Sequence, residues 1–263
     1  MNDLPKLFFP FGQQLKKVEQ KNKTPKKAFV LGVYASAVHA QWKDKNGKQK
    51  VAALAVASEP EIFWTGNEAE GNEIIAKINI PAELGTLSFS RLNGPSGQAL
   101  DELYLEPLGL TRDNTWLSDL LPEARINPSQ KKAIDREYSN IAKAFGLPEV
   151  TIPDFKTSEL DSASRREEIL KELEMSGAET LILLGDLPIK KFLKFYSGQS
   201  VSNLAGFCNE QSPYGTSHEM KINGKHYQII PLCHPRQAAR LGRSSSDWGI
   251  AHDNWIKSLN CTY

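Results

Sequence analysis

A histidine and a carboxylate of this sequence could act together on one ligand. His234 comes shortly after an apolar run that ends at Leu232, and Asp119 lies within the largely apolar stretch 115–122. One well-placed donor to an oxygen that gains negative charge typically lowers a reaction barrier by roughly 3 kcal/mol, and an imidazole can be that donor. Structural roles are the alternative, since His234 could cap the turn before Pro235 and Asp119 could cap the turn that follows it.

A second group of candidate residues comes shortly after Gly32, at the end of the apolar run 28–31. It contains Tyr34, Ser36 and His39. A tyrosine with an ordinary pKa of about 10 is a poor general base at neutral pH. A histidine, with an ordinary pKa of about 6.5, could accept a proton there, although His39 could equally be a plain loop residue.

The elements that would position these residues alternate between strand and helix. Apolar runs predict strands at 28–31, 115–122, 180–185 and 226–232. Amphipathic periodicity and capping residues predict helices at 97–106 after Ser96, and at 129–145, 158–176, 188–195 and 247–259. This alternation predicts an α/β fold, a three-layer αβα sandwich around a mostly parallel four-stranded sheet, with the ligand at the carboxyl ends of the strands.

The remaining segments are predicted as additions to this sheet. The Asn46-Gly47 pair predicts a hairpin that joins 40–43 to 51–56, and 35–40 is predicted as a short helix or tight loop. Residues 60–97 are interpreted as an insertion covering one end of the sheet, with one helical stretch near 68–78. Residues 1–25 are predicted to form a basic, extended or loosely packed arm, and 26–263 a single domain.

Composition narrows the class of protein. The chain has 263 residues, 40% of them hydrophobic, and a net charge of +1, which suits one sizeable core. Neither a membrane helix nor a signal peptide is predicted, so we expect a soluble cytoplasmic protein. The three cysteines lie far apart, so we expect reduced thiols and no metal. Lysines gather in the arm and at 43–50, where they could bind phosphate or simply be solvated.

In order and spacing, the predicted strand ends resemble the uracil-DNA glycosylase superfamily across roughly residues 28 to 258. That superfamily has a strand ending in G-x-(D/N)-P, one ending in Asn or Asp and a proline, an apolar strand ending in Gly, and one ending in H-P-S. The matching segments here are 32–36, 117–122, 183–185 and 231–236. Trp248, His252 and Trp255 are similar to the closing helix of that family.

The resemblance implies a DNA glycosylase-like fold and hydrolysis of the N-glycosidic bond of a flipped base. It implies that His234 donates to an oxygen of the departing base and that Gly32 and Asp119 contact the base. An ionised aspartate only accepts hydrogen bonds, so a modified or amino-bearing base would suit Asp119 better than uracil. We expect single- or double-stranded DNA as partner, a monomer, and no cofactor.

The first motif departs from the family pattern. Tyr34 stands where the family has Asp or Asn, and Ala35 replaces the proline. Either another group activates the water, with Ser36 and His39 the nearest replacements, or the protein binds without cutting.

The base-stacking position also departs from the family pattern. Val56 stands where the uracil enzymes have an aromatic residue. Phe63 or Trp64 could supply the lost stacking surface, or both could be plain core residues.

The segment after His234 is similar to the loop that enters the minor groove in this family. Its candidate DNA-binding residues are Arg236, Arg240, Leu241 and Arg243, with Leu241 as the wedge that fills the gap left by the base. They could also form the start of a basic surface helix.

One branch of the family holds an iron–sulfur cluster with four cysteines. The three scattered cysteines of this sequence exclude that branch.

Two other function classes stay open. One is a catalytically silent nucleic-acid-binding module of the same fold. The other is a hydrolase of free nucleosides or nucleotides, since this architecture serves many small-ligand enzymes. The absence of GxxxxGK[ST] and GxGxxG signatures counts against the second class.

Overall fold

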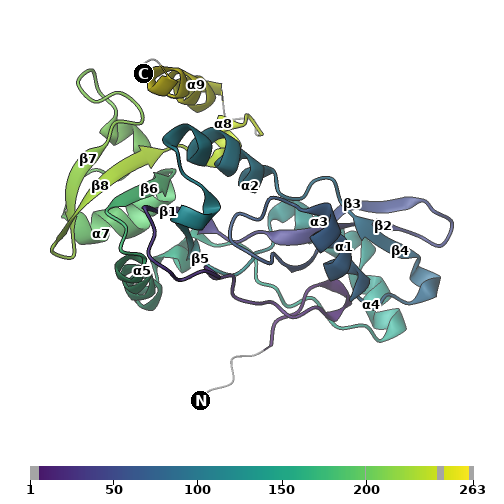
Figure 1. Ribbon diagram of the computed structural model, residues 1–263. Helices are drawn as coiled ribbons and strands as arrows, with labels where there is room; N and C mark the ends of the chain where they lie inside the picture. Colours follow the sequence, from purple (N-terminus) through teal and green to yellow (C-terminus); the bar gives the residue numbers. More distant parts are fainter. Residues whose placement is uncertain (1–5, 199, 242–245, 261–263) are drawn as a thin grey trace.

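The computed structural model describes residues 6–198, 200–241 and 246–260. Its larger sheet has five strands in the order β5-β1-β6-β8-β7 (Figure 1). The bounds are β5 Thr115–Leu121, β1 Ala28–Tyr34, β6 Thr180–Leu184, β8 Lys225–Leu232 and β7 His218–Ile222. The first four are parallel and β7 is antiparallel to β8. All four strands predicted from apolar runs are present.

The predicted count of four strands was wrong because β7 was missed. β7 lies at the edge of the sheet, and its burial alternates between exposed and buried residues. It pairs with β8 through a hairpin whose turn is Asn223 and Gly224. An edge strand with one solvated face has no continuous apolar run, and it therefore lacks the signal that identified the buried strands.

Helices lie on both faces of this sheet, consistent with the predicted three-layer arrangement. Figure 1 shows α5 and α7 below the sheet and α2, α8 and α9 above it. The α-helices of this part are α2 Pro95–Leu100, α5 Ala163–Ser176, α6 Asp186–Pro188, α7 Lys194–Ser197, α8 Pro235–Ala238 and α9 Ser246–Asn260. The shorter helical turns are Asp101–Leu105, Glu106–Leu108, Arg112–Asn114, Thr157–Asp161, Ile189–Leu193 and Leu204–Phe207. The helix predicted after Ser96 begins earlier, at Pro95, with Gly94 before it at φ 76°.

A second, antiparallel sheet has the order β3-β2-β4 and lies to the right in Figure 1. Its strands are β2 Ala37–Lys43, β3 Gln49–Ser58 and β4 Thr86–Phe89. Around it lie α1 Glu68–Ala76, α3 Pro128–Glu137, α4 Ser139–Phe145 and the short turns Pro10–Gly12 and Ala82–Leu84. The predicted hairpin is confirmed as β2 and β3. The helix predicted at 129–145 is divided at Tyr138.

The prediction of a helix or tight loop at 35–40 was wrong, because most of it belongs to β2. Val38, Ala40 and Trp42 are all fully buried, at alternate positions along the chain. This period of two places them on one face of the strand, against the core of the second sheet.

Residues 60–97 contain β4, which is a strand of the second sheet, and α1, which lies beside that sheet. They therefore do more than cover one end of the five-stranded sheet, as was predicted. The N-terminal arm is also more closely packed than predicted. Phe9, Phe11 and Val18 are buried, and the Phe11 ring packs edge-on against Trp42. Aromatic anchors therefore fix this extended segment despite its many lysines. Among the described residues, no helix is long and apolar enough to cross a membrane.

Candidate functional site

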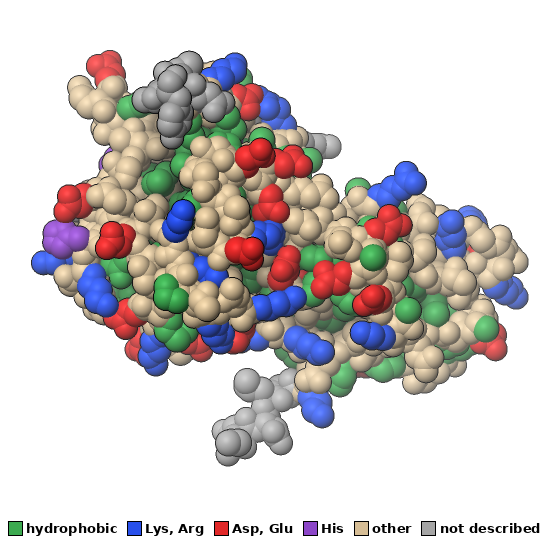
Figure 2. Space-filling model, in the orientation of Figure 1, with side chains coloured by type: hydrophobic (Ala, Val, Ile, Leu, Met, Phe, Trp, Pro, Cys, Tyr) green, Lys and Arg blue, Asp and Glu red, His purple; other side chains and the backbone are tan. Residues whose placement is uncertain are grey.

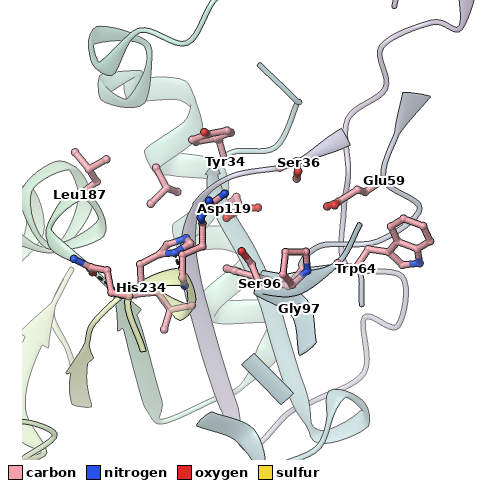
Figure 3. A pocket seen from close by; sticks show the side chains of 18 of the residues that line it. Tyr34, Ser36, Glu59, Trp64, Ser96, Gly97, Asp119, Leu187 and His234 are labelled. Atoms are coloured by element: carbon pink, nitrogen blue, oxygen red, sulfur yellow. Dashed lines mark hydrogen bonds between the residues drawn. The ribbon is translucent and has the colours of Figure 1, made fainter. Parts of the chain in front are cut away.

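A cavity of about 430 Å³ opens where β1, β5, β6 and β8 end. This volume lies in the range of roughly 300–1,000 Å³ that is usual for small-molecule sites. Eight of the candidate site residues named from the sequence line it, namely Tyr34, Ser36, His39, Phe63, Trp64, Asp119, His234 and Arg236. The carboxyl ends of parallel strands meet at one edge of a sheet, which explains why His234 and Asp119 reach the same hollow (Figure 3).

His234 is held by the start of helix α8. Its Nδ1 accepts a hydrogen bond of 3.2 Å from the backbone N–H of Arg236. Burial, helped by the Arg236 charge, lowers the pKa of His234 to about 4. The imidazole is therefore neutral at neutral pH and carries its proton on Nε2. A neutral ring of this tautomer is a hydrogen-bond donor toward the cavity.

Asp119 is a buried carboxyl with an unused oxygen. The residue is 2% exposed, and its Oδ1 has no hydrogen-bond partner among the described residues. Burial raises the pKa of Asp119 to about 7, although the charge of Arg165 opposes the rise. The Arg165 guanidinium contacts the backbone carbonyl of Asp119, at 2.8 and 3.1 Å.

This environment changes what Asp119 can recognise. The predicted preference for an amino-bearing base assumes an ionised carboxylate, which can only accept hydrogen bonds. With a pKa of about 7, a large fraction is protonated at neutral pH. A protonated carboxyl donates one hydrogen bond and accepts others, much as an asparagine does. The prediction of an amino-bearing base therefore holds only for the ionised form.

Glu59 is a second buried carboxyl of the cavity and is not among the site residues predicted from the sequence. It is 8% exposed, and burial, followed by the Asp119 charge, raises the pKa of Glu59 to about 8. Figure 3 shows the two carboxyl groups pointing toward one another. A weak signal was present in the sequence, because Glu59 comes three residues after the predicted hairpin strand 51–56, which extends to Ser58 in the structure. It lies close to Ser36, whose backbone forms a hydrogen bond with its carboxyl group.

Tyr34 forms part of the cavity wall. Its ring stacks on Phe155, with centroids 4.7 Å apart and planes 26° apart. Burial raises the pKa of Tyr34, which makes it still less suitable as a base. Because the ring lies against Phe155, the cavity stays open.

His39 lies on strand β2, not in a loop. Burial lowers the pKa of His39, so its ring is neutral at neutral pH. Its backbone N–H and carbonyl both bond to the Asn93 side chain, at 2.8 Å each. The residue lines the cavity and also serves as an anchor between β2 and the turn at Asn93.

The prediction that Val56 takes the place of a stacking residue was wrong. Val56 is fully buried in the core of the second sheet and does not line the cavity. Phe63 does line it, with its ring centroid 6.3 Å from that of His234. Trp64 reaches the cavity but is 1% exposed and donates to Glu70 at 2.7 Å, so it is mainly a core residue.

Phe63 is held by Arg112. The Phe63 backbone has φ 53°, a left-handed conformation that is uncommon for an aromatic residue. Arg112 donates to the Phe63 carbonyl at 2.5 Å and to both carboxylate oxygens of Asp101 at 2.9 Å. It also pairs with Glu61 at 3.2 Å. These contacts stabilise an unfavourable backbone conformation at the wall of the cavity.

Of the predicted DNA-binding residues that the structure describes, Arg236 lines the cavity and the others do not. Arg236 is exposed and lines it. Arg240 instead pairs with Asp253 at 2.7 Å, and neither Arg240 nor Leu241 is a lining residue. Arg243 lies outside the described residues.

No group of three His, Cys, Asp or Glu side chains suited to a metal ion occurs in the described part of the chain. No model of a known protein family matches this sequence, and no curated protein matches it either. The site must therefore be interpreted from its own geometry.

Proposed function

We propose that this protein hydrolyses the N-glycosidic bond of a nucleobase that is turned out of DNA into the cavity. One observation carries the proposal. The neutral imidazole of His234 and the buried carboxyl of Asp119 line the same cavity of about 430 Å³, and among the described residues neither His234 Nε2 nor Asp119 Oδ1 has a hydrogen-bond partner. A flipped base presents an oxygen that gains charge and a polar edge that must be read, which are the features these two groups complement.

In this proposal His234 stabilises the leaving base. When the bond between the sugar carbon and the base nitrogen breaks, its electron pair goes to the base. The Nε2–H of His234 donates to the oxygen on which the negative charge collects. A neutral donor remains available over the working pH range, because the pKa of His234 is about 4.

Glu59 takes the role that Tyr34 cannot fill. As a carboxylate it accepts a proton from water, while the water oxygen forms a bond to the sugar carbon. A pKa of about 8 makes Glu59 an effective base once it is ionised, because a base works best when its pKa lies near the operating pH. Glycoside hydrolysis by paired carboxyl groups with different environments follows the same logic.

The orientation of the Tyr34 ring favours a catalytic function over binding without catalysis. Its ring lies on Phe155 and leaves room for a base. The face shown in Figure 2 mixes Lys and Arg with Asp and Glu, in keeping with the net charge of +1. DNA binding in this proposal therefore depends on individual arginines near the cavity and not on the field of the whole protein.

The test is base release from oligonucleotides that each carry one altered base, followed by alkaline cleavage of abasic sites. We expect His234→Ala and Glu59→Gln each to reduce release by roughly 100-fold or more. His226→Ala is the matched control, because that histidine is exposed on the hairpin of β7 and β8, pairs with Glu219 and does not line the cavity.

Two further measurements distinguish the alternatives. Free nucleosides are offered in parallel, and DNA binding is followed by fluorescence anisotropy. Binding without release from any substrate would contradict the hydrolase and support the silent module. Cleavage of free nucleosides alone would replace DNA with a small-molecule substrate.

A further inference from the structure

Leu92 is an exposed leucine at the rim of the cavity. It is 63% exposed and lines the cavity, on the turn that joins β4 to α2. A single exposed leucine is ordinary on a protein surface. The position of Leu92 is unusual, because the exposed apolar residues Phe145, Met175 and Ile250 do not line the cavity.

The turn that carries Leu92 is fixed to the second sheet. The buried Asn93 side chain accepts from the His39 N–H and donates to the His39 and Ser90 carbonyls, at 2.8, 2.8 and 3.0 Å. Ser90 Oγ donates to the Ala52 carbonyl at 2.9 Å and accepts from the Leu92 N–H at 3.3 Å. The leucine therefore projects from a rigid support.

Two arginines flank this cavity rim. Arg91 precedes Leu92 and is exposed, and Arg236, two residues after His234, is exposed and lines the cavity. Within the described part of the chain, neither arginine forms an ion pair. Arg236 donates to the Leu241 carbonyl at 3.3 Å, a contact that leaves its positive charge uncompensated, so both charges can attract phosphate groups.

Leu241, the wedge expected from the sequence, is less well placed. It is 41% exposed but does not line the cavity, and its neighbour Arg240 is engaged with Asp253.

We infer that Leu92 is the wedge that enters the base stack of duplex DNA when a base turns into the cavity, with Arg91 contacting a flanking phosphate. This inference rests on the proposed function. Extruding a base leaves a gap, and unstacking costs a few kcal/mol. An apolar side chain on a rigid turn beside the receiving cavity fills that gap. A single strand has no paired stack to hold open, so it does not need the wedge.

The experiment compares wild type with Leu92→Ala on the same altered base in duplex and single-stranded DNA, under single-turnover conditions. We expect the variant to lose about tenfold or more on the duplex and less than about twofold on the single strand, since 1.4 kcal/mol corresponds to tenfold. Ile250→Ala is the matched control, because Ile250 is 54% exposed and not at the cavity. Thermal melting checks that each variant is folded.

The outcomes separate the two proposals. If wild type releases no base from either substrate, the proposed function fails. If wild type is active and Leu92→Ala matches it on duplex DNA, only the wedge is overturned. An equal loss on both substrates also overturns it, because Leu92 would then act on the base itself. A duplex-specific loss in Leu241→Ala, without one in Leu92→Ala, assigns the wedge to the later loop.

Discussion

Gly32 of β1 lies directly beside Asp119 of β5 in the parallel register of the sheet. A Cβ atom on Gly32 would lie 2.3 Å from Asp119 Oδ1 and 2.6 Å from the tip of the Phe63 ring. The absence of a side chain at Gly32 therefore leaves room for a carboxyl and an aromatic ring at the same wall of the cavity.

Gly32→Ala is expected to displace Asp119 or Phe63 and to abolish most base release. Overpacking of this kind typically costs about 1–3 kcal/mol of stability, which urea denaturation measures. Gly249→Ala is the control, because the nearest atom to its added Cβ lies 3.2 Å away on the flexible Arg240 side chain. Full activity in Gly32→Ala would contradict the importance of this contact.

Glu59→Gln is expected to remove much of the pH dependence of stability. The pKa of Glu59 is raised from 4.5 to about 8 by folding, so the folded protein holds a proton that the unfolded chain loses. The free energy of unfolding should therefore fall as pH rises from about 4.5 to 8, by up to about 1.4 kcal/mol per pH unit, and level off above.

Urea denaturation at about pH 5 and pH 8 tests this. The difference between the two pH values should shrink in Glu59→Gln and stay unchanged in Glu73→Gln, which alters an exposed site. In Glu59→Gln the free energy of unfolding should still fall somewhat with pH because of Asp119, and this fall should end near the Asp119 pKa of about 7. An identical pH profile in wild type and Glu59→Gln would rule out the proton on Glu59.

The choice of base is expected to change with pH through Asp119. Below a pKa of about 7 its carboxyl can donate, which favours a base edge with a carbonyl and an N–H. Above that value it only accepts, which favours an exocyclic amine. The ratio of release rates for two such bases isolates this effect, because Glu59 acts on both.

Asp119→Asn should hold this ratio constant with pH, since an amide does not titrate in this range. The measurement is single-turnover release of uracil and of a cytosine-type base between about pH 6 and pH 8.5. A constant ratio in the wild-type protein would refute the assigned role of Asp119.

Arg112→Lys is expected to weaken ligand binding more than turnover. A lysine cannot contact Asp101, Glu61 and the Phe63 carbonyl together, so the strained Phe63 turn loses its support. KM should rise several-fold with a smaller change in kcat, together with a loss of about 1–3 kcal/mol of stability. Arg136→Lys, at an exposed surface position, should change neither. An effect on kcat alone would argue against a positioning role.

Tyr214→Phe is expected to destabilise the end of β8. The Tyr214 hydroxyl accepts from the Cys233 N–H at 2.9 Å and donates to His252 Nδ1 at 2.7 Å, while His252 Nε2 donates to the Leu103 carbonyl. Leaving the buried Cys233 N–H unpaired costs about 1–3 kcal/mol.

Because His234 follows Cys233, base release should fall as well in Tyr214→Phe. The matched control is Tyr227→Phe, whose hydroxyl has no hydrogen-bond partner among the described residues. Equal unfolding free energies for the two variants would show that the Tyr214 network is unimportant.

The sequence by itself determined the parallel strands and the hairpin. Uninterrupted apolar runs such as 181–184 are buried on both faces, and Asn46-Gly47 has the backbone preference of a tight turn. These signals are local, so they can be found without a structure. The meeting of His234 and Asp119 also followed, because parallel strands end at one edge of a sheet.

The tertiary structure alone decided which side chains face the cavity. Val56 and Glu59 lie three positions apart, yet the core of the second sheet takes Val56 while Glu59 lines the cavity with Asp119. The support of Leu92 by Asn93 likewise joins a turn to a strand far away in the sequence. Burial and contact between distant segments depend on how the two sheets pack, and no local pattern of residues encodes that packing.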